Sequence, residues 1–170
     1  MTDVPTHLRV ARPEDSDAVS ALLSASYSSL LAACYDSDAL DCALPILTRA
    51  NPALLVSGTY YVVERQPGHL VGCGGWTAAH PESGKIVEGE AHIRHFATDP
   101  AWVRRGVGSY LLARCLSDAR SFGLRRLHCC STLNAERFYQ ASGFTTVGPI
   151  DVPLRPSLRF PGILMSWELG

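Results

Sequence analysis

The stretch Phe96–Leu112, FATDPAWVRRGVGSYLL, decides how this chain folds. Its first residues continue a run typical of a β-strand, and Asp99-Pro100 ends that run. The apolar residues beyond Gly108 recur at helical spacing and predict a helix from Gly108 to Phe122. The stretch therefore predicts a strand, a glycine-rich loop and a helix, in that order.

The glycine-rich loop has the properties of a phosphate-binding site. Glycines at 106 and 108 let the backbone come close to a ligand. The amides at the start of a helix lack partners within it, and the helix dipole adds positive potential there. We expect a phosphate group on the loop residues Arg104, Arg105, Gly106, Val107, Gly108 and Ser109.

Other interpretations of this loop use the same residues. A tight turn that enters a buried helix is the purely structural one. A Walker loop would need Gly-Lys followed by Ser or Thr, which is absent here. A dinucleotide-binding loop would need a third glycine where Leu111 stands.

The rest of the chain reads as one α/β domain spanning residues 1–170, without repeats or linkers. Hydrophobic patterning predicts strands at 8–11, 59–64, 70–77, 88–98, 127–131, 145–147 and 163–169, and helices at 12–27, 36–47 and 134–142. We expect Pro45 to interrupt the second helix and Asn51-Pro52 to end it. Three glycines within 70–77 predict a bulge or a close backbone approach.

Composition excludes several classes of protein. A formal net charge of -1 over 170 residues gives no support for general nucleic-acid binding. The longest apolar runs are too short for a membrane span, and the N-terminus does not resemble a signal peptide, so we expect a cytoplasmic protein. The six cysteines show no metal-ligand spacing and favour small buried side chains, and a Cys129–Cys130 disulfide would be strained. No metal is expected.

A second segment, from Asn134 to Phe144, helps to interpret the glycine-rich loop. After the strand at 127–131, the chain places Asn134, Tyr139 and the pair Gly143-Phe144 on a short helix. Together with the loop, this order resembles the GNAT superfamily of N-acetyltransferases. Val103 departs from the Gln or Arg usual in that family, and Arg104 stands where glycine is frequent. The resemblance implies a mixed, mostly antiparallel sheet flanked by helices, with the fourth and fifth strands splayed apart.

The resemblance also implies how acetyl-CoA binds. Its pantetheine arm would pair like an extra strand with Phe96, Ala97 and Thr98. Its pyrophosphate would lie on the loop amides described above. Asn134 would hydrogen-bond the pantetheine arm, or would cap the helix that follows it, and both roles are compatible.

Catalytic roles follow from the same resemblance. Tyr139 is the expected general acid that protonates the leaving thiolate, unless it is a half-buried core tyrosine. The position of the family's strand-four base falls on His92, with Glu90 as the backup on the same strand face and Glu88 as a weaker third choice. His92 also fits a purely structural histidine. His95 points to the other face, and Arg94 is expected to pair with Glu90 or to contact an acidic substrate.

The expected reaction is direct transfer of acetyl from acetyl-CoA to a primary amine of a small molecule or peptide, in a ternary complex without an acyl-enzyme. The region 26–52 carries few charges, which favours a small or partly apolar amine over a polycation. Aromatic side chains expected around the acceptor, although each also fits the core, are Trp76, Tyr27, Tyr35 and Trp102. The alternative is a catalytically silent acyl-CoA-binding or regulatory module. The resemblance also suggests a homodimer formed through the C-terminal strands.

Overall fold

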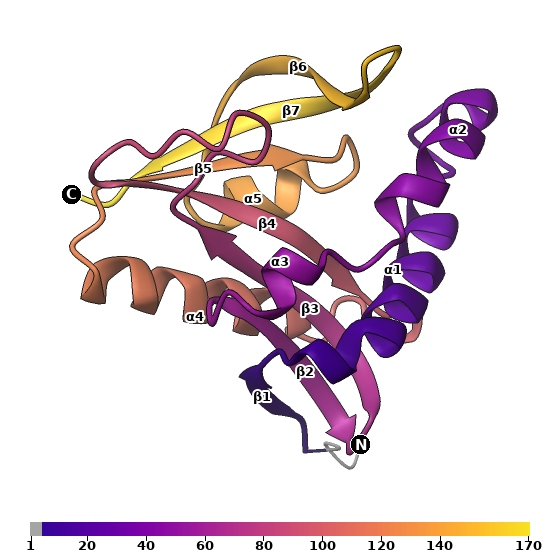
Figure 1. The fold of residues 1–170 in the computed structure, drawn as a ribbon, viewed down its shortest axis with the longest axis horizontal. Coiled ribbons are helices and arrows are strands. Elements are labelled where there is room, and N and C mark those ends of the chain that lie inside the picture. Colours follow the sequence, from indigo (N-terminus) through magenta and orange to yellow (C-terminus); the bar gives the residue numbers. More distant parts are fainter. Residues whose placement is uncertain (1–4) are drawn as a thin grey trace.

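In the computed structural model, which describes residues 5–170, the chain folds around one seven-stranded sheet (Figure 1). The strands lie in the order β1-β2-β3-β4-β5-β7-β6, and only the β4–β5 pair is parallel. Their bounds are His7–Val10 (β1), Tyr60–Gln66 (β2), His69–Thr77 (β3), Glu90–Thr98 (β4), Arg126–Ser131 (β5), Thr145–Arg155 (β6) and Leu158–Glu168 (β7). This is the expected mixed, mostly antiparallel architecture.

Helices cover both faces of the sheet. They are α1 (Ser16–Leu30), α2 (Ser37–Leu47), α3 (Pro52–Leu55), α4 (Val107–Ser121) and α5 (Glu136–Ser142), with short 3-10 turns at Pro13–Asp15 and Pro100–Trp102. Side chains alternate along the strands: Val62 and Cys73 join the core under α1 and α2, whereas Tyr61 and Val71 join the core under α4. Burial on both faces explains why residues 60–63 of β2 and 70–76 of β3 carry no charged side chain.

The central helix α4 starts and ends where its sequence requires. Gly106 precedes it with φ +82°, a conformation that a side chain would strain, and Gly123 leaves it at φ +69°. The stripe Leu111, Leu112, Cys115 and Ala119 is fully buried against the sheet. The predicted strand, loop and helix are therefore confirmed.

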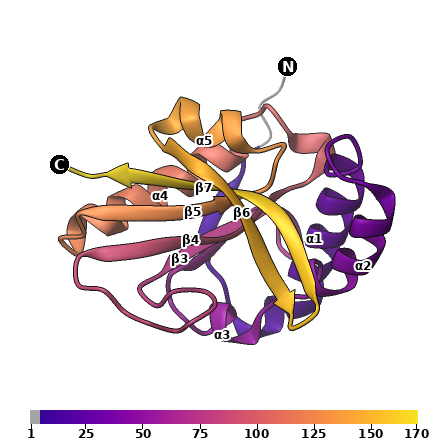
Figure 2. The same ribbon diagram turned by 90° about the horizontal axis from the view of Figure 1, so that it is seen from above.

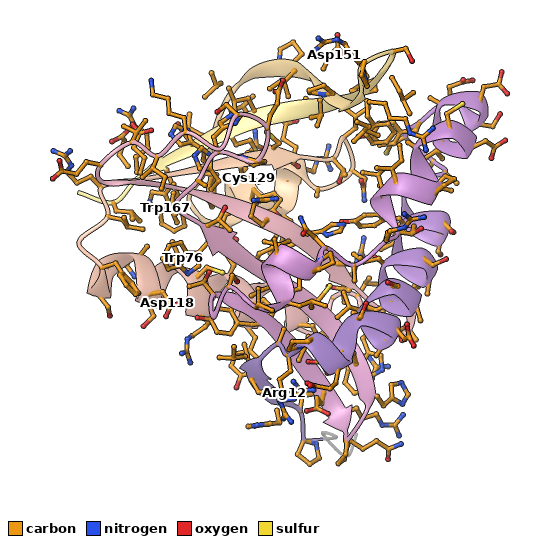
Figure 3. All side chains as sticks on the ribbon, viewed as in Figure 1. Arg12, Trp76, Asp118, Cys129, Asp151 and Trp167 are labelled. Carbon is orange, nitrogen blue, oxygen red and sulfur yellow. The ribbon has the colours of Figure 1, made fainter. Side chains whose placement is uncertain are left out.

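A buried polar cluster holds α4 on the sheet. One carboxylate oxygen of Asp118 accepts hydrogen bonds from the Trp76 indole, at 3.0 Å, and from the Tyr61 hydroxyl. The other oxygen accepts from Arg114 at 3.2 Å. Figure 3 shows Trp76 and Asp118 next to each other where α4 crosses the end of the strands. Trp76 belongs to this core and lines neither cavity described below, so the expectation that it borders the acceptor is wrong.

The sheet is interrupted where β4 meets its neighbours. Pairing with β5 covers Glu90 to His92 and stops at His92 opposite His128. On the other side, the register with β3 shifts between Cys73 and Gly75, and His95 of β4 takes φ +53°. The three glycines of β3 permit this close approach, since a Cβ on Gly74 would lie 2.4 Å from the Phe96 ring. The predicted bulge and the predicted splay of β4 and β5 are both present.

The second helix ends at Leu47 as predicted, but the roles expected of its two prolines were wrong. Pro45 lies inside α2 without ending it, and Asn51-Pro52 begins α3, with the Asn51 side chain accepting from Ala53 N at 2.9 Å. The C-terminal strands form a hairpin of eleven residues a side, much longer than predicted. Prolines in β6 are tolerated because β6 is an edge strand. Figure 2 shows this hairpin reaching over the sheet toward α1 and α2.

Two further observations concern the whole described chain. Within residues 5–170, no helix combines the length and apolar character needed to cross a membrane.

All six cysteines are free thiols; Cys73, Cys115 and Cys129 are buried, whereas Cys34, Cys42 and Cys130 are exposed. The expectation of small buried side chains is thus right for three of them and wrong for the other three.

Candidate active site

A cavity of about 690 Å³ runs through the sheet where β4 and β5 part. On the α4 side it is lined by Val107, Phe138 and Tyr139, and on the α1 side by Tyr27 and Phe160. These side chains belong to the two separate cores of the molecule, so the cavity connects the two faces of the sheet.

The glycine-rich loop forms the first end of this cavity. Residues 104 and 106 both have positive φ, +61° for Arg104 and +82° for Gly106, which turns the backbone sharply before α4 begins. A Cβ on Gly108 would lie 3.1 Å from the Phe138 ring, so the ring would have to shift by a few tenths of an ångström to accept it. Expected cofactor residues that line the cavity are Phe96, Ala97, Thr98, Arg104, Gly106, Val107, Gly108, Ser109, Asn134 and Tyr139.

Arg105 is the exception among the expected loop residues. Its guanidinium lies 5.0 Å from the centroid of the Trp102 ring, outside the cavity lining. Trp102 itself does line the cavity. The Arg105 side chain therefore packs against Trp102 outside the cavity and stabilises the loop through a cation–π contact.

Tyr139 is buried in the cavity wall within an aromatic cluster. Its ring makes edge-to-face contacts with Phe138, Phe144 and Phe96, at centroid distances of 5.0, 5.5 and 6.2 Å. Burial, together with the neighbouring Cys129 thiol, raises the pKa of the phenol well above its ordinary value of 10.0. The hydroxyl therefore stays protonated at physiological pH, as a proton donor must.

Asn134 lines the cavity between β5 and α5. The helix that follows it begins at Glu136 with Ala135 in the capping position, and no side chain caps it. The interpretation of Asn134 as a helix cap is therefore wrong. Its carboxamide is one of the few polar side-chain groups at this part of the cavity.

Tyr35, between α1 and α2, closes the second end of the cavity. Its ring stacks on Phe160 at 4.3 Å, and its hydroxyl donates to Pro161 O at 2.7 Å and accepts from Leu133 N at 2.9 Å. One residue thus joins the helical layer to β7 and to the loop after β5. Apolar side chains that share this end are Tyr27, Leu30, Leu31, Leu47, Val152, Leu154 and Phe160.

The bulge in β4 is braced from the same side. The Tyr27 hydroxyl donates to Phe96 O at 2.9 Å, and the Tyr60 hydroxyl donates to His95 O at 2.8 Å. His95 is half-buried and lines the larger cavity, with Nε2 2.9 Å from Leu47 O, and desolvation lowers the pKa of its imidazole. His95 therefore lies on the opposite face from His92, as expected, and its ring nitrogen is tied to the end of α2.

The expected bases do not line this cavity. His92 and Glu90 line a smaller cavity of about 340 Å³, which borders the larger one at Ile93 and Cys130. Arg94 donates to Thr77 Oγ1 at 3.0 Å instead of pairing with Glu90. Glu88 is exposed in the loop before β4. The structure thus brings Tyr139 and the loop together and leaves His92 and Glu90 in an adjoining space.

Comparison with known proteins identifies the family. The family model described as "Acetyltransferase (GNAT) family" matches residues 23–144. The chain belongs to the GNAT acetyltransferase family. It is accordingly an acetyl-CoA-dependent acyltransferase. A search of curated proteins found no match to it.

Solved GNAT structures share the fold over nearly the whole chain. A GCN5-related N-acetyltransferase from Rhodopseudomonas palustris has 21% identity and a TM-score of 0.74, covering 99% of this chain and 98% of its own. The PaiA N-acetyltransferase from Thermoplasma acidophilum, solved with coenzyme A, has 13% identity and a TM-score of 0.69, covering 96% and 99%. The ribosomal-protein-S18-alanine N-acetyltransferase from Escherichia coli has 14% identity and a TM-score of 0.64, covering 98% and 95%.

Sequence reasoning missed several residues that border the two cavities of this GNAT chain. His128 on β5 and His80 in the loop after β3 face His92 across the smaller cavity. Phe160 lies on a strand that was predicted too short. The pairing of β4 with β5 could have pointed to His128, because a parallel register places it opposite His92.

Proposed function

We propose that this acetyltransferase moves the acetyl group of acetyl-CoA to the primary amine of a small apolar or aromatic molecule. The observation that carries the proposal is the cavity through the sheet, with the glycine-rich loop at one end and an aromatic chamber at the other. Tyr139 lies in the wall of that cavity. A thioester bound along the unpaired edge of β4 would be presented to the chamber.

The β4 edge fits an extended pantetheine arm. Beyond His92, the residues of β4 up to Thr98 have no β5 partner. The carbonyls of His95 and Phe96 already accept from Tyr60 and Tyr27, so a ligand that lies alongside would bind the remaining backbone groups of this edge. The pyrophosphate would meet the amides of residues 104–109. The arm would pass Asn134, and the thioester would end near Phe96 and Tyr139.

The scarcity of charged side chains in the larger cavity favours an acceptor with a single amine. Among the described residues lining the larger cavity, Arg104 carries the only permanent charge, and it lies at the phosphate end. A polyamine or an aminoglycoside would bring several ammonium groups without a carboxylate to pair with them, which is unfavourable in an apolar space. An aromatic amine would instead pack against Tyr27 and Phe160 and react in its neutral form.

The proposed mechanism is direct attack. The neutral amine forms a bond to the thioester carbonyl carbon, and the carbon–sulfur bond breaks as the tetrahedral intermediate collapses. The leaving thiolate takes the phenolic proton of Tyr139, and the proton still on the nitrogen replaces it. The raised pKa of Tyr139 does not oppose this step, because the same burial destabilises the thiolate.

The test is acetyl-CoA turnover, followed as free thiol, with 2-phenylethylamine as the acceptor and spermidine as the polycationic comparison. We expect turnover with 2-phenylethylamine and little with spermidine. Tyr139→Phe should lower kcat about 100-fold, the usual range for a lost general acid. Tyr110→Phe is the matched control, since Tyr110 is exposed on α4.

Each contrary outcome has a distinct meaning. Full activity of Tyr139→Phe would make Tyr139 a core residue only. Tight binding of acetyl-CoA by calorimetry, without turnover of any amine, would favour the silent acyl-CoA-binding module. Faster turnover of spermidine than of 2-phenylethylamine would contradict the assignment of the acceptor.

A further inference from the structure

The smaller cavity contains three imidazoles from three different segments. His80 comes from the loop after β3, His92 from β4 and His128 from β5. The His92 ring lies 5.1 Å from each of the other two, edge-on to His80 and stacked on His128. Within residues 5–170, no three such side chains are arranged as ligands for a metal ion. We therefore consider whether this group of imidazoles binds and transfers protons.

One of the three rings is held by a carboxylate. His128 Nε2 lies 2.8 Å from Glu90 Oε2, and Arg126 donates to the other Glu90 oxygen at 3.2 Å. The hydrogen bond from His128 lowers the pKa of Glu90, so the carboxylate is ionised and can only accept. The proton of the neutral His128 ring is thereby fixed on Nε2, which leaves the lone pair on Nδ1.

The other two rings are poorly suited to accept a proton. Burial, then the neighbouring His128 and His80, lowers the pKa of His92 to about 4. The Nδ1 lone pair of His80 already accepts from the amides of Glu82 and Ser83, both at 3.2 Å. His80 therefore fastens its own loop over the cavity, and His92 is a weak base at neutral pH.

His128 is also on the correct side of the sheet. Cys130 lies two residues further along β5, so the two side chains share a face. Cys130 borders both cavities, and Ile93 does so from β4. The boundary between the cavities therefore lies next to His128, close to where the proposed acceptor chamber meets the splayed strands.

We propose that His128, oriented by Glu90, accepts the proton of the acceptor ammonium, in the role expected of His92. This inference rests on the proposed acetyl transfer. The N–H bond of the ammonium breaks and its proton joins Nδ1 of His128, directly or through one water. The neutral amine then attacks as described above, and His128 returns its proton to solvent through the smaller cavity. One proton is released for each acetyl group transferred.

Charged and titratable groups surround His128 from each neighbouring element. β4 contributes Glu90 and His92, and β5 itself contributes Arg126 and Cys130. The loop after β3 contributes His80 and Lys85. From the hairpin, β7 places the neutral Ser166 opposite His128, and Ile150 and Leu164 complete the lining. Glu90 is the only anion among these neighbours that hydrogen-bonds to the ring in the described chain.

The test uses the full chain with saturating acetyl-CoA and 2-phenylethylamine between pH 6 and pH 10. His128→Gln keeps an N–H group for Glu90 and removes the proton acceptor. We expect its kcat to fall about 100-fold at pH 7, and the deficit to shrink near pH 10, where the amine loses its proton unaided. The kcat of His92→Gln should fall less than about threefold, because this variant removes a neighbour of the proposed base and not the base itself. His69→Gln, an exposed histidine at the start of β3, is the matched control.

Four further readings separate the outcomes. Acetyl-CoA affinity and melting temperature should be unchanged in His128→Gln, which excludes misfolding. A large loss in His92→Gln with none in His128→Gln would overturn the inference while leaving acetyl transfer intact. A deficit of His128→Gln that is constant across pH would also overturn it, because a merely structural role gives a constant loss. Absence of turnover by the wild type with every amine would overturn the proposed function and this inference together.

Discussion

The two cavities share a wall at Ile93 and Cys130 but differ in the titratable side chains that line them. The larger cavity is lined by aromatic and aliphatic side chains and depends on the position of α4 and on the splay of the strands. The smaller one gathers three imidazoles, a carboxylate and Lys85. In the proposed reaction, this separation would place the amine beside Tyr139 and the acceptor of its proton among the imidazoles. Perturbing one cavity should therefore leave the other largely intact.

The largest expected effect on stability comes from releasing α4. Asp118→Ala leaves the buried Trp76 indole and Tyr61 hydroxyl without their acceptor, and we expect a loss of about 3 kcal/mol in the free energy of unfolding. Acetyl-CoA affinity should fall with it, whereas the histidine ring signals in NMR should hardly move. Urea unfolding and calorimetry measure the two effects.

Arg114→Ala is the control for this prediction. Arg114 contacts the same carboxylate, but its side chain is half exposed, so its removal should cost less than about 0.5 kcal/mol. A typical hydrogen bond contributes about 1 kcal/mol to stability. If the free energy of unfolding of Asp118→Ala fell by less than this, the polar cluster would not be what holds α4 in place.

A smaller effect is expected where β3 meets the first turn of α4. In Gly72→Ala the new Cβ would lie 2.3 Å from Val107 Cγ1, and we expect overpacking to lower the free energy of unfolding by about 2 kcal/mol. Because the displaced residue begins α4, acetyl-CoA binding should weaken as well. Urea unfolding gives the stability, and calorimetry the affinity.

A double mutant cycle checks the cause. Adding Val107→Ala to Gly72→Ala should restore more than half of the lost stability, because Val107 makes by far the closest contact and the next, Leu111 Cδ1, lies at 3.2 Å. Simple additivity of the two losses would show that Gly72 acts through the strand itself and not through its contact with α4.

The smallest effect concerns His92 and the smaller cavity. Above about pH 6.5 this ring is neutral in both the folded and the unfolded chain. Between about 6.5 and 4, the unfolded chain binds a proton there that the folded chain does not, so the free energy of unfolding falls as the pH drops. After allowance for the half-exposed ring, we expect the wild type to lose about 1 kcal/mol more than His92→Gln between pH 7.5 and pH 4.5.

The measurement is urea unfolding at several pH values, with His69→Gln as the control that should follow the wild type. Equal losses in the wild type and in His92→Gln would mean that the smaller cavity does not disfavour the protonated form of this ring. The contrast between the titratable groups of the two cavities would then need revision.

Much of the fold could be predicted because its signals are local. The glycines of the loop and the apolar stripe of α4 lie within a few residues of each other, so spacing alone placed the strand, the loop and the helix. The longer hairpin was missed because proline usually ends a strand, and only the edge position of β6 permits it. The same local logic failed at Pro45, where packing keeps α2 intact.

The candidate site divides in the same way. Local patterning indicated the glycine-rich loop, the family and the helix that carries Tyr139, since each depends on residues close together in the chain. Which cavity each side chain lines depends instead on how distant segments pack together. His92 faces His128 through a parallel pairing of distant strands, and Tyr35 reaches Pro161 across the gap between helix and hairpin. Such juxtapositions depend on long-range packing, and local spacing and propensity contain no information about it.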